Sequence, residues 1–266
     1  MGGRTLFSAT LSTGSVLAEY AMKILTVYAH PDPKSFCHAV LQRFTQGLED
    51  AGHTHEVVDL YAIGFNPVLT ARDSANWLPD EYAPDIAEKV VKERVFAPDA
   101  GLLQRLIAWS KFRNKSPLEV MAALGKTGPA DVRQQQRKVA DAQALVFISP
   151  VWFVGFPAIL KGWIERVFTL GFAFSLNSAG WRGDIGGRIG LLKHDKALII
   201  NTTIFNEKSY QEAGLREAMR RLIDDFCLHY PGIQTVEHEF FYAVNLADQD
   251  TLQAYLERAY RLGREF

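Results

Sequence analysis

The residues ALVFISPVWFVGFP, positions 144–157, join a wholly apolar run to a loop that contains two prolines and a glycine. Residues 144–149 have the length and unbroken hydrophobicity of a strand buried on both faces, as strands of parallel sheets are. The segment that follows, residues 158–170, has the apolar spacing of a helix. A buried strand, a rigid loop and a helix in this order predict an α/β fold.

The same unit recurs along the chain. Residues 23–29 (KILTVYA) predict a first buried strand, and Ser35 then caps a helix that ends at Gly52. Residues 55–60, 197–201 and 236–242 predict three more strands, and residues 210–227 and 248–262 predict helices. These elements predict a doubly wound parallel sheet of five strands, because parallel neighbours need crossover connections. The flavodoxin-like order 2-1-3-4-5 fits best, with a ligand at the carboxyl ends of strands 1, 3 and 4.

Two segments interrupt this alternation. Residues 70–133 separate strands 2 and 3 and are too long for a plain loop, so we expect a helical insertion. Within it, apolar residues 102–109 stand among basic side chains (Arg105, Lys111, Arg113, Lys115). We expect this stretch to pack on its own domain or on a dimer partner, and contact with a membrane surface is the alternative. Residues 1–21 show no helix or strand period, and we expect a dispensable extension.

Composition excludes several classes of function. Of 266 residues, 48% are hydrophobic, and 29 Lys and Arg nearly cancel 30 Asp and Glu, so no strong positive field predicts nucleic-acid binding. No apolar run is long enough to span a membrane. Cys37 and Cys227 are far apart, which favours a reducing, cytoplasmic location. The histidines form no ligand motif, so we predict no metal.

The loop after the first strand delivers Ser35, Phe36 and Cys37 to a helix N-terminus. Free amides and the helix dipole favour a phosphate there. The loop is neither a GxGxxG fingerprint nor a Walker loop, so it supports neither a Rossmann dehydrogenase nor an ATPase. Taken alone, a simple capped helix explains the serine equally well.

The loop after the third strand is fixed by Pro150, Gly155 and Pro157 and carries Trp152 and Phe153. Such a loop suits a flat ring, whose polar edge the backbone would read while the aromatic side chains flank its face. The alternative is an aromatic plug of the core. The position of the loop at the expected ligand edge of the sheet favours the flat ring.

The stretch SPVWFVGFPAILKGWIERVF, residues 149–168, closely resembles the signature of the NAD(P)H:quinone oxidoreductase (DT-diaphorase) family of flavodoxin-like flavoproteins. YAHPDPKSF at 28–36 and DLYAIGFNPVL at 59–69 also resemble that family. The resemblance covers residues 22–76 and 139–210, and the middle motif is its most specific part. It implies a flavin, FAD by the first loop although FMN-using relatives share the fold.

The resemblance also implies roles for individual residues. The flavin phosphate and ribityl chain would be held by His30, Ser35, Phe36 and Cys37, and the isoalloxazine ring would be lined by Pro150, Val151, Trp152, Phe153, Val154 and Gly155. Thr202 and Thr203 match a Thr pair, and Tyr210 falls at the spacing of the catalytic tyrosine. The sequence departs from the family in having Cys37 for asparagine, Ile204-Phe205 for Gly-Gly, and Arg216 for a histidine. Arg216 is then either a charge that offsets the reduced flavin or a solvated helix residue.

The function implied is ping-pong, two-electron reduction of a quinone or related aromatic acceptor, with NADH or NADPH as donor. The resemblance further implies a homodimer, with residues 158–168 near its interface and Phe172 and Phe174 as candidate walls of the pocket. A second hypothesis is a regulatory flavoprotein subunit of a potassium efflux-type transporter. A flavodoxin-type electron carrier ranks last, because its Ser/Thr-rich phosphate loop and acidic surface are missing.

Overall fold

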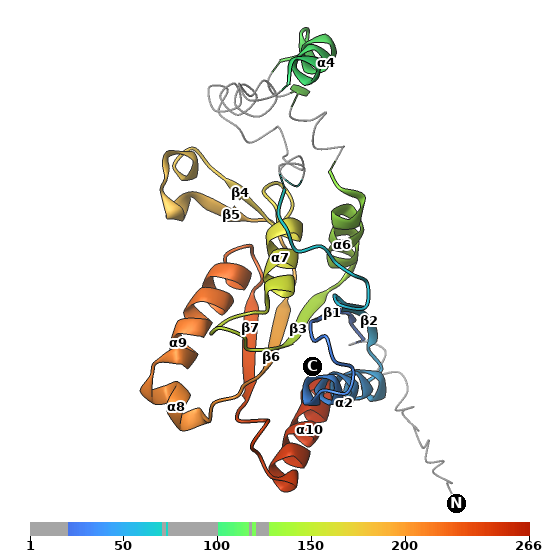
Figure 1. Ribbon diagram of the computed structural model, residues 1–266, viewed down its shortest axis with the longest axis vertical. Helices are drawn as coiled ribbons and strands as arrows, with labels where there is room; N and C mark the ends of the chain where they lie inside the picture. Colours follow the sequence, from blue (N-terminus) through green and yellow to red (C-terminus); the bar gives the residue numbers. More distant parts are fainter. Residues whose placement is uncertain (1–20, 71–72, 74–100, 117–118, 121–127) are drawn as a thin grey trace, which may run out of the picture.

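The protein is built around a five-stranded parallel sheet in the order β2-β1-β3-β6-β7 (Figure 1). The computed structural model describes residues 21–70, 73, 101–116, 119–120 and 128–266. The strands are β1 (Lys23–Tyr28), β2 (Thr54–Asp59), β3 (Ala144–Pro150), β6 (Lys196–Thr202) and β7 (Thr235–Phe241). This order is the 2-1-3-4-5 order predicted from the sequence, so the predicted fold class is confirmed. All seven residues of the central strand β3 are buried.

One face of the sheet is covered by α2 (Phe36–Asp50) and α10 (Gln249–Arg264), which lie against each other (Figure 1). The two helices approach closely because glycines occupy the contact. A Cβ on Gly47 would lie 2.2 Å from the carbonyl oxygen of Tyr260, and one on Gly263 would lie 2.2 Å from that of Phe44. The backbones therefore touch at this crossing, and no larger side chain fits there.

The other face is covered by α6 (Ala130–Asp141), α7 (Ala158–Val167), α9 (Leu215–Arg220) and the π-helix η5 (Arg221–His229). The sequence predicted one helix over residues 210–227, and this continuity was wrong. Gly214, at φ 65°, separates α8 (Glu207–Glu212) from α9, and the chain then widens into η5. A glycine takes this left-handed conformation at little cost, which explains the break.

A hairpin that the sequence did not predict follows α7. Its strands β4 (Phe174–Leu176) and β5 (Arg188–Gly190) are antiparallel, and the 3-10 turns η3 (Gly180–Arg182) and η4 (Ile185–Gly187) lie between them. The guanidinium of Arg188 lies 4.3 Å from the ring centre of Phe174 and 3.6 Å from that of Tyr230. The first contact joins the two strands of the hairpin, and the second fastens the hairpin to Tyr230, the residue that follows η5.

Within the predicted insertion, α4 (Leu102–Phe112) is a helix that lies far from the sheet (Figure 1). Five of its apolar side chains are between 54% and 80% exposed (Leu102, Leu103, Leu106, Ile107, Trp109) and do not pack on the described part of their own domain, whereas Phe112 at its last position is buried. Packing on a dimer partner stays a prediction. The rest of the insertion lies largely outside the described residues, as does the predicted extension except for Ala21. Among the described helices, none has the length and hydrophobicity needed to cross a membrane.

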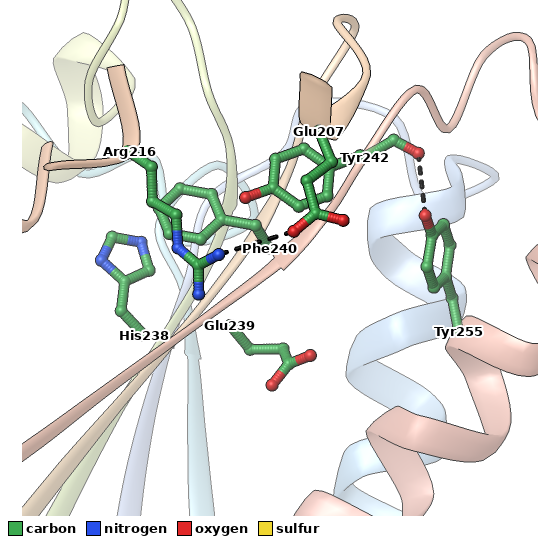
Figure 2. Close-up of a pocket in the computed structure, with 7 residues that line it drawn as sticks. All are labelled: Glu207, Arg216, His238, Glu239, Phe240, Tyr242 and Tyr255. Atoms are coloured by element: carbon green, nitrogen blue, oxygen red, sulfur yellow. Dashed lines mark hydrogen bonds and ion pairs between the residues drawn. The ribbon is translucent and has the colours of Figure 1, made fainter. Parts of the chain in front are cut away.

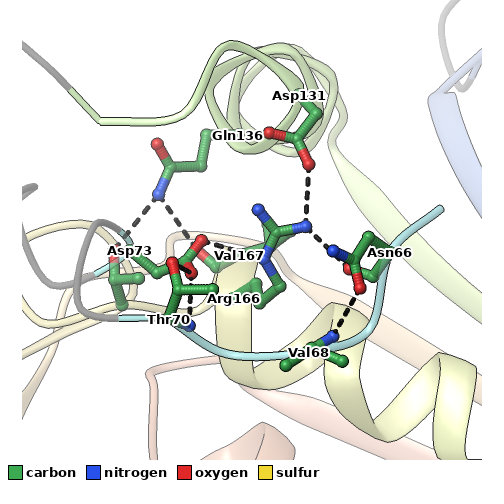
Figure 3. A network of polar contacts seen from close by, with 9 residues as sticks. Asn66, Val68, Thr70, Asp73, Asp131, Gln136, Arg166 and Val167 are labelled. Atoms are coloured by element: carbon green, nitrogen blue, oxygen red, sulfur yellow. Dashed lines mark hydrogen bonds and ion pairs between the residues drawn. The ribbon is translucent and has the colours of Figure 1, made fainter.

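Arg166 on α7 anchors the start of the insertion to the sheet domain (Figure 3). Its guanidinium donates to Asp73 over 2.8 Å, to Asp131 on α6 over 2.7 Å and to the carbonyl oxygen of Asn66 over 2.7 Å. Asp73 is fully buried and also accepts from the backbone and hydroxyl of Thr70 over 2.7 Å each. Such a satisfied buried pair fixes the segment after β2 against α7.

Candidate functional site

The loops after β1 and β3 meet at the carboxyl edge of the sheet. The rings of His30 and Trp152 lie 5.9 Å apart with a tilt of 54°. In the β3 loop, Trp152 is 39% exposed and Phe153 is fully exposed. An aromatic plug of the core would be buried, so the structure favours the interpretation of this loop as a surface for a flat ligand. Gly155 leaves open space, because a Cβ there would meet no atom within 4 Å.

The tip of the β3 loop is a strained two-residue turn. The amide of Trp152 donates to the carbonyl of Gly155 over 3.1 Å, and the reverse bond measures 3.3 Å. Phe153 and Val154 between them have φ values of 47° and 61°. A turn of this kind ordinarily uses Asn or Gly, and a β-branched residue at positive φ is rare. Strain of this sort collects at ligand sites.

The N-terminus of α2 begins beside this loop. The Ser35 side chain is its N-cap and accepts from the amide of His38 over 3.2 Å. The amides of Phe36 and Cys37, in the first turn, have no intrahelical acceptor and carry the positive end of the helix dipole. The preceding loop is held by His30, whose Nδ1 accepts from the amide of Asp32 over 3.0 Å. The sequence predicted a phosphate at these amides as one of two alternatives, and that site stays a prediction.

Cys37 and Thr202 lie together beneath that helix end. Both side chains are buried, and burial raises the pKa of the Cys37 thiol to about 12 against a hydrogen bond with Thr202. A thiol in this state is an apolar packing group and not a nucleophile. The group of Cys37 that could contact a ligand is therefore its backbone amide in the first turn of α2. Val151, buried at the base of the β3 loop, donates its amide to the carbonyl of Thr202 over 2.8 Å, which joins the two loop bases.

Tyr210 is buried at 2% exposure, and its ring packs 5.3 Å from Tyr242 and 6.0 Å from Phe240. Burial raises the pKa of its hydroxyl, and a hydrogen bond with the Thr203 side chain opposes that shift. The hydroxyl therefore keeps its proton near neutral pH and can donate. The structure thus brings the side chains of Tyr210 and Thr203 together.

A cavity of about 260 Å³ opens beside β7, at the edge of the sheet (Figure 2). Its lining comes from α8, α9, β7, the residue after β7, and α10, and comprises Glu207, Arg216, His238, Glu239, Phe240, Tyr242 and Tyr255. Arg216 Nη1 lies 3.5 Å from Glu207 Oε1, and the arginine side chain is 33% exposed. Arg216 thus lines this cavity together with Tyr242, while a third of its side chain stays exposed to solvent.

A buried polar chain that sequence reasoning missed crosses the sheet behind these loops. Nδ1 of His238 lies 2.8 Å from Oδ1 of Asp224, and its Nε2 lies 2.9 Å from Oδ1 of Asn201. Asn201 donates through Nδ2 to the carbonyl and hydroxyl oxygens of Ser149, over 3.0 and 3.2 Å. The alternation of Val236, His238 and Phe240 along β7 was the available signal, since it places the histidine on the buried face.

Similarity to named proteins extends over most of the chain. An uncharacterized NAD(P)H oxidoreductase of Haemophilus influenzae is 26% identical over 90% of this chain and 92% of its own. The NAD(P)H dehydrogenase (quinone) 1 of Cavia porcellus is 27% identical over 86% of this chain and 71% of its own. Among solved structures, the NAD(P)H:quinone oxidoreductase of Methanothermobacter marburgensis is 27% identical with a TM-score of 0.64, over 92% of this chain and 96% of that one.

The family comparison agrees with the sheet order and with the position of the loops. The model of a family described as having a flavodoxin-like fold matches residues 22–262. That range spans all five strands of the sheet and both helical layers. The chain belongs to this flavodoxin-like fold family.

Proposed function

We propose that this protein is a flavin-dependent NAD(P)H:quinone oxidoreductase. The observation that carries the proposal is the β3 loop, in which exposed Trp152 and Phe153 stand on a strained turn at the ligand edge of the sheet. The relatives named NAD(P)H dehydrogenase and NAD(P)H:quinone oxidoreductase support the same activity. When bound, a flavin supplies the chemistry that no side chain here has, namely acceptance of a hydride and delivery of two electrons.

The residues at this edge fit a flavin. The free amides of Phe36 and Cys37 at the α2 N-terminus would hold its phosphate, with Ser35 and His30 shaping the loop. The isoalloxazine ring would lie over the backbone of Pro150 to Gly155, which leaves open space at Gly155. Thr202 ends the neighbouring strand β6 and Thr203 follows it, and both would border the ring. We propose FAD as the flavin, with FMN as the alternative.

Tyr210 is the residue to which we assign a catalytic role. A phenol donor placed here would stabilise the negative charge that a reduced flavin carries on the pyrimidine edge of its ring. Burial keeps the Tyr210 hydroxyl protonated against the opposing effect of the hydrogen bond with Thr203 on its pKa, so the hydroxyl is suited to donate. Arg216 cannot release a proton near neutral pH, because a guanidinium stays charged. Its contribution would be limited to offsetting charge.

We further propose that NAD(P)H and the acceptor occupy the same position in turn, in ping-pong order, and that the protein works as a homodimer. In this chain Phe172 and Phe174 pack partly against their own core, with Arg188 over Phe174. Their exposed edges stay candidates for the wall of the pocket. A cytoplasmic location is a prediction that rests on the two free cysteines.

The experiment that tests the function is an anaerobic absorption titration of the purified protein. A flavin band that bleaches with NADH or NADPH and returns on addition of a benzoquinone is the expected result, and chromatography of the released flavin distinguishes FAD from FMN. Absence of binding after reconstitution with either flavin overturns the proposal. A flavin that binds but does not bleach favours the regulatory subunit or the electron carrier.

A further inference from the structure

The chain of hydrogen bonds from Asp224 to Ser149 has a direction that follows from its last member. Asn201 donates to the backbone carbonyl of Ser149, and a carbonyl can only accept. The amide nitrogen of Asn201 therefore faces Ser149, and its oxygen Oδ1 faces Nε2 of His238. Because Oδ1 also only accepts, Nε2 of His238 must carry a hydrogen. The fixed carbonyl thus sets the tautomer of a histidine two strands away.

The second nitrogen of His238 faces a carboxylate. Its partner Asp224 lies on the π-helix η5, at 7% exposure, and the imidazole side chain is fully buried. The pair therefore shares a proton between Nδ1 and Oδ1, whichever atom carries it. Arg220 lies close to both residues: its Nε is 3.8 Å from Asp224 Oδ2, and its Nη2 donates to the His238 carbonyl over 3.3 Å. Arg216 is the other charged group that acts on the imidazole.

The hydrogen-bonded chain from Asp224 to Ser149 leads to the carboxyl ends of β3 and β6, from which the proposed flavin loops begin. Ser149 immediately precedes Pro150, and Asn201 immediately precedes Thr202. In the sheet Ser149 and Asn201 are direct register partners, so the hydrogen bond from Asn201 ties β3 to β6 where both loops begin. All four side chains are buried, so water does not compete for these bonds.

We propose that Asp224, His238 and Asn201 are positioning residues for the flavin-binding loop. They act in this way only when His238 carries a hydrogen on Nε2, and this donor-to-acceptor direction of the hydrogen bonds is called the polarity below. The proposal rests on the proposed function for its ligand. The polarity itself can be read without any flavin. None of the three residues touches the loop tip; they act through the carbonyl of Ser149.

The first test reads the histidine tautomers in the flavin-free protein. With ¹⁵N-labelled histidine, a long-range ¹H–¹⁵N spectrum should show a protonated Nε2 on His238. His194 provides an internal reference, because its Nε2 lies 2.9 Å from the carbonyl of Val139 and must be protonated too. An Nε2 without a hydrogen on His238 overturns the proposal, since Asn201 would then have to turn its oxygen toward the Ser149 carbonyl.

The second test uses two amides that imitate different nitrogens of the imidazole. His238→Gln places its amide near the Nε2 position and can still donate to Asn201, whereas His238→Asn places its amide near Nδ1 and cannot. With FAD and FMN as probes, we expect His238→Gln to bind within about threefold of wild type and His238→Asn at least about tenfold more weakly, the cost of an unpaired buried group. Glu237→Gln, on the exposed face of β7 in an ion pair with Lys196, is the matched control.

The outcomes separate this inference from the proposed function. Equal flavin affinity of His238→Gln and His238→Asn, both folded by circular dichroism, overturns the positioning role while the oxidoreductase proposal stands. If wild type binds neither flavin, the proposed function and the positioning role fail together, and the polarity of the chain is still decided by the nitrogen spectrum. Should His238→Asn not fold, His238→Gln decides the positioning role: affinity within about threefold of wild type supports it, and a loss of about tenfold or more, absent in Glu237→Gln, overturns it.

Discussion

The rings of His30 and Trp152, 122 positions apart in the sequence, lie 5.9 Å from each other and join the loops after β1 and β3. The contact brings an exposed indole beside the N-terminus of α2, where an anion would sit. A ligand with both a phosphate and a flat ring therefore meets two suitable surfaces within one site. The first prediction follows from this pairing.

Trp152→Ala should weaken flavin binding by about tenfold or more, because loss of an aromatic contact costs roughly 0.5–1.5 kcal/mol beyond the lost buried area. The free energy of unfolding of the ligand-free protein should change little, since the side chain is partly exposed. Fluorescence titration with FAD and FMN measures the affinity. Trp109→Ala on α4, where the tryptophan is 54% exposed, is the matched control and should bind as wild type does. Equal affinity of both variants would place the ring elsewhere.

Val154→Gly should raise the free energy of unfolding by about 1 kcal/mol or more, because glycine adopts positive φ without the strain that a β-branched residue suffers. The residue has φ 61° and is half-exposed, so little packing is lost with its side chain. Urea denaturation of the flavin-free protein is the measurement. Val68→Gly, at a loop position of similar exposure and without positive φ, should instead lower the stability. A loss of stability in both variants would contradict the strain.

Tyr210→Phe should lower the rate of flavin reduction by at least about tenfold, since removal of one preorganised donor typically costs 10²–10³ in rate. The phenyl ring keeps its contacts with Tyr242 and Phe240, so flavin affinity and stability should stay near those of wild type. Anaerobic stopped-flow mixing with NADH and NADPH gives the rate. Tyr260→Phe, which removes a hydroxyl that donates to Asp50 on α2, is the control. An unchanged rate in Tyr210→Phe would remove the residue from the mechanism.

Much of the fold could be predicted because its signals are local. The central strands are continuous apolar runs, and the cap of α2 needs only Ser35 at the right place. The β4–β5 hairpin could not be predicted, because its strands have only three residues each. The contact between Arg188 on β5 and Phe174 on β4 joins residues on opposite sides of the turn. The break at Gly214 could not be predicted, because the sequence shows there only a glycine within a helical pattern.

The candidate site could likewise be predicted only in part. Prolines and aromatic residues marked the β3 loop, but the positive φ of Phe153 and Val154 is a property of the folded turn. His238 stands between two glutamates in the sequence, which resembles an exposed strand. Its burial depends on Asp224 and Asn201, partners 14 and 37 positions away that only the fold brings together.

Gly47→Ala should lower the free energy of unfolding by about 3 kcal/mol or more, at the upper end of overpacking costs, because the added methyl meets backbone and not a movable side chain. The separation of α2 from α10 would have to grow, which would also disturb the helix that Ser35 caps. Thermal and urea denaturation measure the loss. Gly101→Ala is the control, since a Cβ there meets nothing within 4 Å and the residue has no positive φ. Equal stability of the two variants would contradict the close helix crossing.

The pair between Asp131 and Arg166 predicts how stability depends on pH. Partial burial alone would raise the pKa of the Asp131 carboxyl, but the hydrogen bond and charge of Arg166 outweigh it and hold that pKa below its usual value. A folded-state pKa below the unfolded value of about 3.9 means that the carboxylate stabilises the fold above that pH and loses this contribution as pH falls through the folded pKa. Wild type should therefore lose more stability than Asp131→Asn between pH 5 and acidic pH, to an extent limited by the exposure of the carboxylate. Urea denaturation at stepped pH values measures both proteins, and parallel curves would contradict the pairing.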